Sequence, residues 1–438
     1  MEEDRLIEQA KIEHVTPLRD LKELIQTAAD ASNPELQLTA VQEIRTLLSS
    51  KNPPINDLIQ NGILPILVES LKEKYDRNLQ FEAIWALVSI CSGNSEQTTQ
   101  VVAAGAVPYF LKFLESPNLE IWEPTLYSLA NIIGDGPLLR DFLIRLGVVQ
   151  SLLSFIQWDM SPQILCNVIL VIGNLCRHYD PPIARETVLQ ILPALEVLIS
   201  HEDMEILKWT LWVISFLAGG WQEHIQMVVE SEMLPKVISL MGHEKVKVQN
   251  AALRAVRKIM SGTDEQCQLV LNHNPLSHFT SVVFFADKKI HREQVKFLWR
   301  VTSRNHLWVQ AIINEGLLAK IIEILKNGGL QERAVAARAI SNLTMRCNED
   351  QLLILVLEDV LRPFCDLLTC QFEEITKTVL SGLSNMLKVS NAHADELTKA
   401  IYECGGLAKI ERLQTHESVE IYQQAQQLID LYFSDSTV

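Results

Sequence analysis

The chain has 438 residues, 48% of them hydrophobic and 21% charged, and its formal net charge at pH 7 is −16. General binding to nucleic acids needs a basic field that displaces counterions from the phosphates, so this charge balance argues against it. An acidic chain is suited to basic partners, although a modest excess of carboxylates can also serve solubility alone.

Turn signals divide the chain into units of nearly constant length. Glycine or proline punctuates residues 61–65, 104–108, 146–149, 191–193, 233–235, 315–318, 361–363 and 405–408. Glycine frees the backbone for a turn, and proline fits the first turn of a helix, where its missing N–H has no partner. The segments between these signals have helical periodicity. We expect each unit to hold a short helix, a second helix and a longer third helix, for example over 79–91 and 331–346.

The predicted third helices carry two ladders of positions with a step of about 42 residues. The first ladder is Trp85, Tyr127, Leu170, Trp212, Arg254, Lys296, Arg338 and Ser381. The second ladder, four residues later in each unit, is Ser89, Asn131, Asn174, Phe216, Lys258, Arg300, Asn342 and Asn385. Positions i and i+4 lie one above the other on a helix, so the ladders predict a surface that shows the same pair of positions in every unit.

A fixed period of this size is typical of a solenoid, in which each unit buries its apolar face against its neighbours. Dividing the chain length by the period gives about ten units. We therefore predict an all-α solenoid over residues 16–433. A short, loosely ordered extension over 1–15 precedes it, and a frayed tail over 434–438 follows it.

The eight cysteines form no Cys-x-x-Cys pair, and most lie among apolar residues, which is typical of reduced core cysteines inside cells. They are Cys91, Cys166, Cys176, Cys267, Cys347, Cys365, Cys370 and Cys404. The chain opens without the pattern of a signal peptide, and it has no apolar run long enough to span a membrane. We expect a soluble cytoplasmic or nuclear protein.

Motifs for catalysis and cofactor binding are missing from the sequence. The eleven histidines form no His-x-x-x-His pair or Cys/His cluster with metal-ligand spacing. Neither a glycine-rich phosphate loop nor a Gly-x-Ser-x-Gly elbow is present. We predict that the protein is not an enzyme and needs no cofactor or metal.

Three segments resemble the importin-α (karyopherin-α) family, the armadillo-repeat adaptors of nuclear import. They are FEAIWALVSICSGNSEQT at 81–98, ALRAVRKIMSGTDEQ at 252–266 and ECGGLAKIERLQTHE at 403–417. The resemblance runs in register from about residue 18 to residue 433. It implies an armadillo-repeat solenoid of about ten three-helix repeats that winds into a right-handed superhelix.

In that family the ladder pair is Trp with Asn four residues later. An asparagine amide offers donors and an acceptor, so it can hold the backbone of an extended peptide. Neighbouring indole rings flank the aliphatic stems of Lys or Arg and attract their cationic heads. The resemblance implies two sites for basic nuclear localisation signals in a concave groove, a major site on the early repeats and a minor site on the later ones.

The residues of the major site match the family in part. The resemblance places Trp85, Ser89, Gly93, Thr98, Tyr127, Asn131, Asp135, Leu170, Asn174 and Trp212 there. Ser89 replaces an asparagine, while Tyr127 and Leu170 replace tryptophans. The remaining rings, Trp85, Tyr127 and Trp212, are expected to wall the lysine slots. Losing one stacking ring costs about 0.5–2 kcal/mol per slot.

The family's strongest lysine pocket combines a backbone carbonyl, a threonine and an aspartate, which match Gly93, Thr98 and Asp135. We expect this pocket to persist with weaker neighbours, and Asp135 and Thr98 to grip one lysine. Pro124 stands where the family has a glutamine, and we expect it to shorten or bend the start of its helix and to remove one peptide contact.

The residues of the minor site depart further from the family. The resemblance places Arg254, Glu293, Lys296, Arg300, Arg338 and Asn342 there. Lys296 and Arg338 replace tryptophans. Arg300 replaces an asparagine, and so does Lys258, which lies beside Arg254. Such a row of cations would repel a basic peptide and could attract an acidic one. It could equally be a solvated face that offsets acids elsewhere.

Family members open with an arginine- and lysine-rich segment that binds importin-β and, when free, occupies the protein's own groove. Residues 1–22 hold only Arg5, Lys11, Arg19 and Lys22, scattered among acids. Whether the natural protein lacks the basic segment or this sequence is a shortened one, we expect no self-inhibition and no usual docking on importin-β.

Two hypotheses for function stay open. The first is a divergent nuclear-import adaptor that binds lysine-rich signals on its early repeats, with an export receptor at the C-terminal repeats and importin-β recruited indirectly. The second is a scaffold or cargo chaperone that sequesters basic partners or binds an acidic partner on its later repeats. A hydrolase or transferase has no motif support.

Each candidate residue also has a purely structural interpretation. Trp85 and Trp212 could be buried aromatics, Asn131 and Asn174 could bond nearby backbone, and Asp135 could cap a helix. The shared phase of these residues along the chain favours a repeated partner instead.

Overall fold

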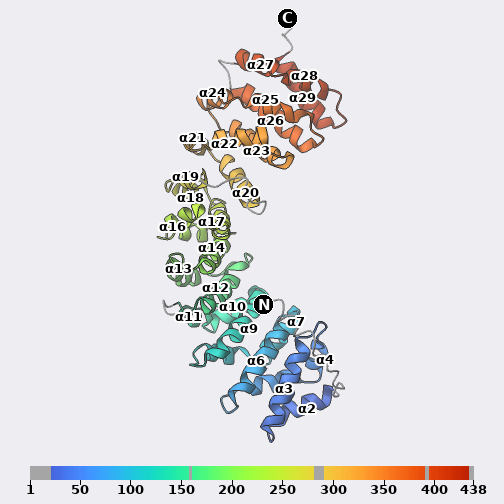
Figure 1. The fold of residues 1–438 in the computed structure, drawn as a ribbon, viewed down its shortest axis with the longest axis vertical. Coiled ribbons are helices and arrows are strands. Elements are labelled where there is room, and N and C mark those ends of the chain that lie inside the picture. The colour runs from blue at the N-terminus through green and yellow to red at the C-terminus, as the bar shows by residue number, and fades with distance from the viewer. Residues whose placement is uncertain (1–20, 157–159, 281–290, 390–393, 434–438) are drawn as a thin grey trace. The chain divides into compact units, whose positions relative to one another are not determined.

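The computed structural model describes residues 21–156, 160–280, 291–389 and 394–433. These residues form helices and turns and contain no strand. The chain divides into two compact units, residues 1–198 and residues 199–438 (Figure 1). The predicted extension over 1–15 and the tail over 434–438 lie outside the described residues.

The first unit is built of twelve α-helices and one 3-10 turn within the described residues. They are α2 (Leu21–Ala29), α3 (Pro34–Leu48), α4 (Ile55–Gln60), α5 (Ile63–Ser70), α6 (Arg77–Cys91), α7 (Ser95–Ala103), α8 (Val107–Leu114), η1 (Leu119–Ile121), α9 (Trp122–Gly134), α10 (Pro137–Arg145), α11 (Val148–Leu153), α12 (Pro162–Arg177) and α13 (Arg185–Leu198).

The second unit continues the same alternation of short and long helices. Its elements are α14 (Met204–Leu217), α15 (Gln222–Glu230), α16 (Leu234–Ser239), η2 (Leu240–Gly242), α17 (Val246–Ile259), α18 (Asp264–Leu271), α19 (Pro275–Thr280), α20 (His291–Thr302), α21 (His306–Asn314), α22 (Leu317–Asn327), α23 (Leu330–Thr344), α24 (Glu349–Leu357), α25 (Leu361–Cys365), η3 (Asp366–Thr369), α26 (Glu373–Val389), α27 (Ala394–Glu403), α28 (Gly406–Leu413) and α29 (Val419–Tyr432).

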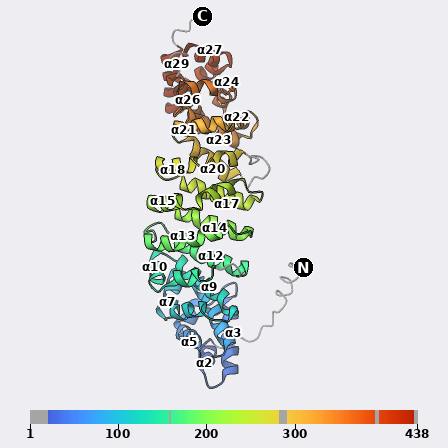
Figure 2. The same cartoon turned by 90° about the vertical axis from the view of Figure 1, so that its left-hand side faces the viewer.

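The third helix of each repeat packs against the third helix of the next repeat within its unit. This series is α3, α6, α9 and α12 in the first unit, and α14, α17, α20, α23, α26 and α29 in the second. Figure 2 shows the stacking of α14, α17, α20 and α23. The ten helices of these two series, counted among the described residues, agree with the prediction of about ten repeats.

Glycine turns begin the second helix of several repeats, as the sequence predicts. Gly62, Gly147, Gly316 and Gly405 each precede a helix with φ between +67° and +89°. This left-handed conformation is strained for residues that carry a Cβ atom. Asn274 and Asp359 have φ values of +53° and +60° before α19 and α25. The glycine pattern missed these two turns, although Asn and Asp tolerate this conformation better than other side chains.

The turn predicted at 191–193 is wrong, because α13 runs through Pro193 without a break. The first and second helices of that repeat are therefore one helix. Pro124 lies in the first turn of α9, which follows the 3-10 turn η1 and has 13 residues, against 15 in α6 and 16 in α12. The loss of a peptide contact at Pro124 stays a prediction. A proline tolerates the first turn of a helix but not its interior ladder of hydrogen bonds.

A buried glutamine ties successive repeats together at three places. Gln97, Gln266 and Gln351 each complete a capping box at the start of α7, α18 and α24. The Nε2 atoms of these side chains then donate to the preceding repeat, at 2.7 Å to Asn56 Oδ1, 2.9 Å to Gln226 Oε1 and 2.9 Å to Gln310 Oε1. Satisfying buried amides in this way fixes the register between neighbouring repeats.

The described helices include none that is both long enough and apolar enough to cross a bilayer. All eight cysteines are free thiols, and five of them are buried, as expected for core cysteines.

Candidate peptide-binding face

Every predicted ladder pair lies on the third helix of its repeat. The pairs 85/89, 127/131 and 170/174 lie on α6, α9 and α12 of the first unit. The pairs from 212/216 to 381/385 lie on α14, α17, α20, α23 and α26 of the second unit. We call these the first-unit ladder and the second-unit ladder.

Two aromatic rings of the first-unit ladder contact each other across α6 and α9. The ring centroids of Trp85 and Tyr127 are 6.1 Å apart and their planes are inclined by 41°. Phe81 adds an edge-on contact to Trp85 at 6.4 Å. Rings at these separations attract one another directly. The structure therefore places an aromatic platform here, where the sequence led us to expect an open slot between two walls.

The polar positions of the first-unit ladder differ from one another. Ser89 Oγ donates to the Trp85 carbonyl of its own helix at 3.1 Å. Asn174 Nδ2 donates to the Ala130 carbonyl on α9 at 2.8 Å, which joins neighbouring third helices. The half-buried Asn131 amide makes no hydrogen bond with any residue that the structure describes. Asn131 thus keeps its full capacity for donating and accepting toward a ligand.

The three residues of the predicted lysine pocket surround the turn between α6 and α7. Asp135 ends α9, and one of its carboxylate oxygens, Oδ2, accepts a 2.8 Å hydrogen bond from Ser95 Oγ at the start of α7. Gly93 lies exposed in the turn itself. Sequence reasoning missed Ser95, whose only signal is its position about one repeat before Asp135.

Thr98 differs from the expectation of a lysine contact at the surface. Its side chain is only 1% exposed, and its hydroxyl donates to the carbonyls of Cys91 and Asn94, each at 3.2 Å. Thr98 therefore braces the turn that carries Gly93.

The Cys91 thiol at the end of α6 is also buried. Its burial, with the negative charge of Asp135 nearby, raises its pKa to about 12.

Leu170 is half-buried on α12 and offers an apolar surface in place of a ring. Trp212, on α14 of the second unit, has a cation on its face already. The guanidinium carbon of Arg254 lies 3.9 Å from the Trp212 ring centroid and 5.8 Å from that of Phe216. The two rings meet edge to face at 6.0 Å. The chain itself thus supplies the cation that the sequence led us to expect from a ligand.

Glu293 of the predicted minor site is paired within the chain. Its Oε2 lies 3.1 Å from Arg257 Nη2, and its Oε1 lies 3.1 Å from Lys296 Nζ. Burial would raise the pKa of Glu293, but the charge of Arg257 and the hydrogen bond and charge of Lys296 outweigh it, so the pKa is lowered. Sequence reasoning missed Arg257, because it lies one position outside the ladder.

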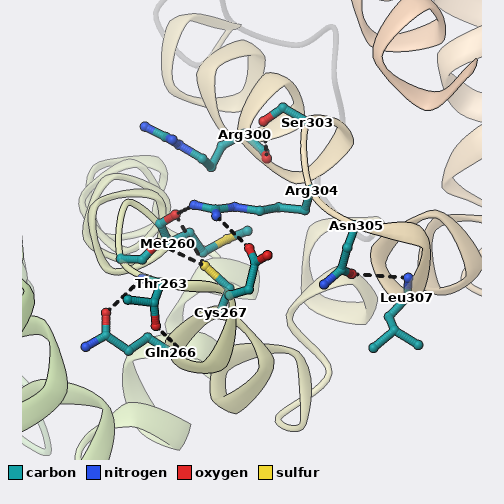
Figure 3. A network of polar contacts seen from close by, with 11 residues as sticks. Met260, Thr263, Gln266, Cys267, Arg300, Ser303, Arg304, Asn305 and Leu307 are labelled. Carbon is teal, nitrogen blue, oxygen red and sulfur yellow. Dashed lines mark hydrogen bonds and ion pairs between the residues drawn. The ribbon is translucent and has the colours of Figure 1, made fainter. Parts of the chain in front are cut away.

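Further cations surround this pair on α17 and α20. Burial, followed by the charges of Arg257, Arg254 and Arg300, lowers the pKa of Lys258. Arg304 bonds the Met260 carbonyl and lies 3.2 Å from Asp264 Oδ1. Figure 3 shows Arg304 reaching toward Met260, while the Arg300 side chain points away from that network. Burial and the charges of Arg304 and Arg257 also lower the pKa of Arg300.

The last ladder pairs repeat one hydrogen bond. Asn342 Nδ2 lies 3.4 Å from Thr302 Oγ1 on α20, and Asn385 Nδ2 lies 3.5 Å from Thr344 Oγ1 on α23. Together with Asn174, they join a third helix to the one before it. Arg338 is exposed on α23 and forms no ion pair with the described residues.

Among the described residues, the tryptophans outside the ladders have packing or surface roles. Trp308 is buried, and Trp122 packs edge-on against Phe155 and donates to the Ser116 carbonyl at 2.9 Å. Trp221 and Trp299 are about half exposed. Within the part of the chain that the structure describes, no group of three His, Cys, Asp or Glu side chains could hold a metal ion.

Two repeat families and several relatives match the chain. The model of the armadillo/beta-catenin-like repeat matches residues 51–92 and 222–261, and that of an atypical Arm repeat matches residues 395–438. Importin subunit alpha-3 of Caenorhabditis elegans is 47% identical, and the match covers 95% of this chain and 81% of that protein. Importin subunit alpha-1b of Oryza sativa subsp. japonica is 34% identical, with 95% and 79% covered.

Solved structures show the same fold. The crystal structure of an engineered protein, 22% identical, superposes with a TM-score of 0.79 over 94% of this chain and 98% of that one. A designed armadillo repeat protein in complex with the peptide (KR)4 is 26% identical, with a TM-score of 0.50 over 55% of this chain and all of that one. The fold is an all-α armadillo-repeat fold, and the chain belongs to the importin-α family of nuclear-import proteins.

Proposed function

We propose that this protein is a nuclear-import adaptor that binds lysine-rich nuclear localisation signals, in extended form, on the first-unit ladder. The observation that carries the proposal is the position of Asp135. Its carboxylate is half-buried one helical turn beyond Asn131, whose amide has no partner among the described residues. A carboxylate and an unbonded amide on one face are what a lysine side chain and the adjoining peptide backbone need.

Each residue of the face has a distinct role in this proposal. Asp135 binds the lysine ammonium, together with the Gly93 carbonyl, and Ser95 and Thr98 hold that turn in place. Asn131 binds the peptide backbone. Asn174 keeps its Oδ1 and a second N–H for the same purpose while bonding Ala130. The Trp85–Tyr127 platform supports an aliphatic stem lying across it, so flanking lysines bind more weakly than in a deep slot.

The similar proteins support this function. The relatives that span most of this chain are named as importin alpha subunits. The designed armadillo repeat protein of similar fold holds a peptide of alternating lysine and arginine. We further propose that its cargo proteins carry basic signals and that it recruits importin-β indirectly. We also propose that an export receptor binds its C-terminal repeats and that the protein passes between cytoplasm and nucleus.

The test is binding of a fluorescent lysine-rich signal peptide, followed by anisotropy, to the unmodified chain and to Asp135→Lys. We expect salt-sensitive binding that the variant weakens by about tenfold or more, because reversing a charge at a half-buried contact changes the binding free energy by more than about 1.4 kcal/mol. Glu115→Lys reverses an exposed carboxylate off the ladders, at the end of α8, and should bind like the unmodified chain.

Absence of peptide binding by the unmodified chain would contradict the adaptor proposal. The alternative is a scaffold or cargo chaperone, which the cations of the second-unit ladder favour. A pull-down with purified importin-β separates the two, because direct capture through any segment favours a carrier.

A further inference from the structure

A basic cluster occupies the second-unit ladder where α17 and α20 pack together. It consists of the ladder residues Arg254, Lys258, Lys296 and Arg300, with Arg257 on α17 and Arg304 just after the end of α20. Arg254 is anchored on Trp212, Arg257 and Lys296 bracket Glu293, and Arg304 is held by the Met260 carbonyl. Arg338 continues the row one ladder step later on α23. Contacts within the chain therefore hold four of these seven cations in place.

Positive charge exceeds negative charge in this array. Five positive charges come from Arg257, Lys296, Arg300, Arg304 and Arg338. Their ion pairs with described residues involve two carboxylates, one on Glu293 and one on Asp264. An excess of three remains, without counting Arg254 and Lys258 beside them. The chain as a whole has a net charge of −16, so this excess is concentrated on one face against the overall balance.

The cations also destabilise one another. Burial and neighbouring cations lower the pKa values of both Lys258 and Arg300. Like charges held at short range and partly out of water raise each other's free energy, and an anion bound among them would relieve this repulsion. A solvated face would let such side chains spread apart, whereas Trp212, Glu293 and Met260 keep several of these in place.

The spacing of the array fits an extended peptide. Packed helices lie about 8–10 Å apart, and an extended chain advances about 3.3 Å per residue, so one ladder step corresponds to about three peptide residues. Lysine and arginine side chains only donate, which suits carboxylates. Asn342 can still accept from a peptide N–H through its Oδ1, since its Nδ2 is the atom that bonds Thr302.

We infer that the second-unit ladder is a docking site for an extended, aspartate- or glutamate-rich segment of a partner protein, with an acidic residue at about every third position. The site uses the ladder positions of the importin-α fold with the opposite charge preference. The inference does not depend on lysine-rich signals binding to the first unit, because the two faces are tested with different peptides and different variants.

The test uses the full chain and a fluorescent peptide of about twelve residues with glutamate at every third position and neutral residues elsewhere. We expect binding that weakens as salt is added. The variant Arg300→Asn with Arg338→Asn should weaken it by about tenfold or more. The matched control, Lys236→Asn with Lys399→Asn, removes two exposed cations outside the ladders and should change it by less than about twofold.

Three outcomes would overturn the inference. They are no binding of the peptide at low salt, equal weakening by the ladder variant and its control, and no preference over a peptide with the same glutamates in one block. Tighter binding of a single-stranded oligonucleotide of similar charge, lost in the ladder variant, would assign the face to nucleic acid and also reject it. Melting curves by circular dichroism show whether each variant keeps the fold.

Discussion

The two ladders occupy equivalent backbone positions and have opposite chemistry. On α6, α9 and α12 the pairs combine rings, an apolar side chain, amides and a serine, and Asp135 adds a negative charge at the edge. On α17, α20 and α23 the same positions hold Arg254, Lys258, Lys296, Arg300 and Arg338. Armadillo repeats fix where the side chains stand, and the identity of those side chains then decides which charge a partner must have.

The comparison also separates the ladder asparagines that bond a neighbouring third helix from the one that does not. Asn174, Asn342 and Asn385 each donate to the preceding third helix, in whichever unit they lie. Their recurrence therefore has a structural cause. From the sequence pattern alone, we had attributed it to a repeated partner. Asn131 makes no such bond among the described residues, so it is the ladder amide most available to a ligand.

The largest expected change comes from converting the second-unit ladder to the chemistry of the first. In an Asp135→Lys background, in which binding to the first unit is weakened, Lys258→Asn, Lys296→Trp, Arg300→Asn and Arg338→Trp together should raise the affinity for a lysine-rich peptide above that of Asp135→Lys alone. The change removes four repelling charges, each worth about 1 kcal/mol, and releases one oxygen of Glu293 from Lys296. Isothermal titration calorimetry would measure the gain.

The matched control replaces the same four residues with alanine. It removes the same charge but adds no ring or amide, so it should recover only the part of the affinity that repulsion suppressed. Equal affinity in the two quadruple variants would mean that ladder rings and amides contribute nothing in this fold.

A smaller change is expected from completing the first-unit ladder. Ser89→Asn with Tyr127→Trp should tighten lysine-peptide binding by about 0.5–1.5 kcal/mol, because the amide and the larger ring add backbone and cation–π contacts. Anisotropy titration against the unmodified chain measures the shift. Ser92→Asn adds an amide one turn away from the ladder position, and an equal gain there would contradict a site-specific effect.

The last prediction concerns thiol reactivity, which should have the smallest effect on peptide binding. The reactivity of cysteines should nevertheless differ clearly between the two units. Hydrogen bonding from Cys365, with help from the Gly406 N–H and the charges of Lys409 and Arg362, lowers the pKa of Cys404 despite partial burial. Cys91 in the first unit has its pKa raised to about 12. Because the thiolate is the reactive form, Cys404 should alkylate first at pH 7 and reach its plateau rate at lower pH than an ordinary thiol.

Iodoacetamide labelling followed by peptide mass spectrometry checks this order. Cys365→Ala should slow labelling of Cys404 at pH 7, since it removes the S–H donor whose hydrogen bond favours the Cys404 thiolate. Labelling of Cys91 at the rate of Cys404 would show that the two environments do not differ.

The sequence by itself determined the repeat period, the third helices that carry the ladders, and the turns at Gly62, Gly147, Gly316 and Gly405. The helices and turns depend on residues within one repeat, where hydrophobic spacing and backbone preference act locally, and the period follows from their recurrence along the chain. The merged helix α13 was missed because packing of its apolar side, including Val188 and Leu195, keeps the chain helical through Pro193.

Only the tertiary structure decided what the ladder side chains bind. The bonds Ser95–Asp135, Asn174–Ala130 and Arg257–Glu293 join residues that are 40, 44 and 36 positions apart. The placement of Arg254 on Trp212 likewise joins two repeats. Such contacts depend on how one repeat is rotated and shifted against the next. A periodic pattern shows which residues share a face, but the packing between repeats decides which of them touch.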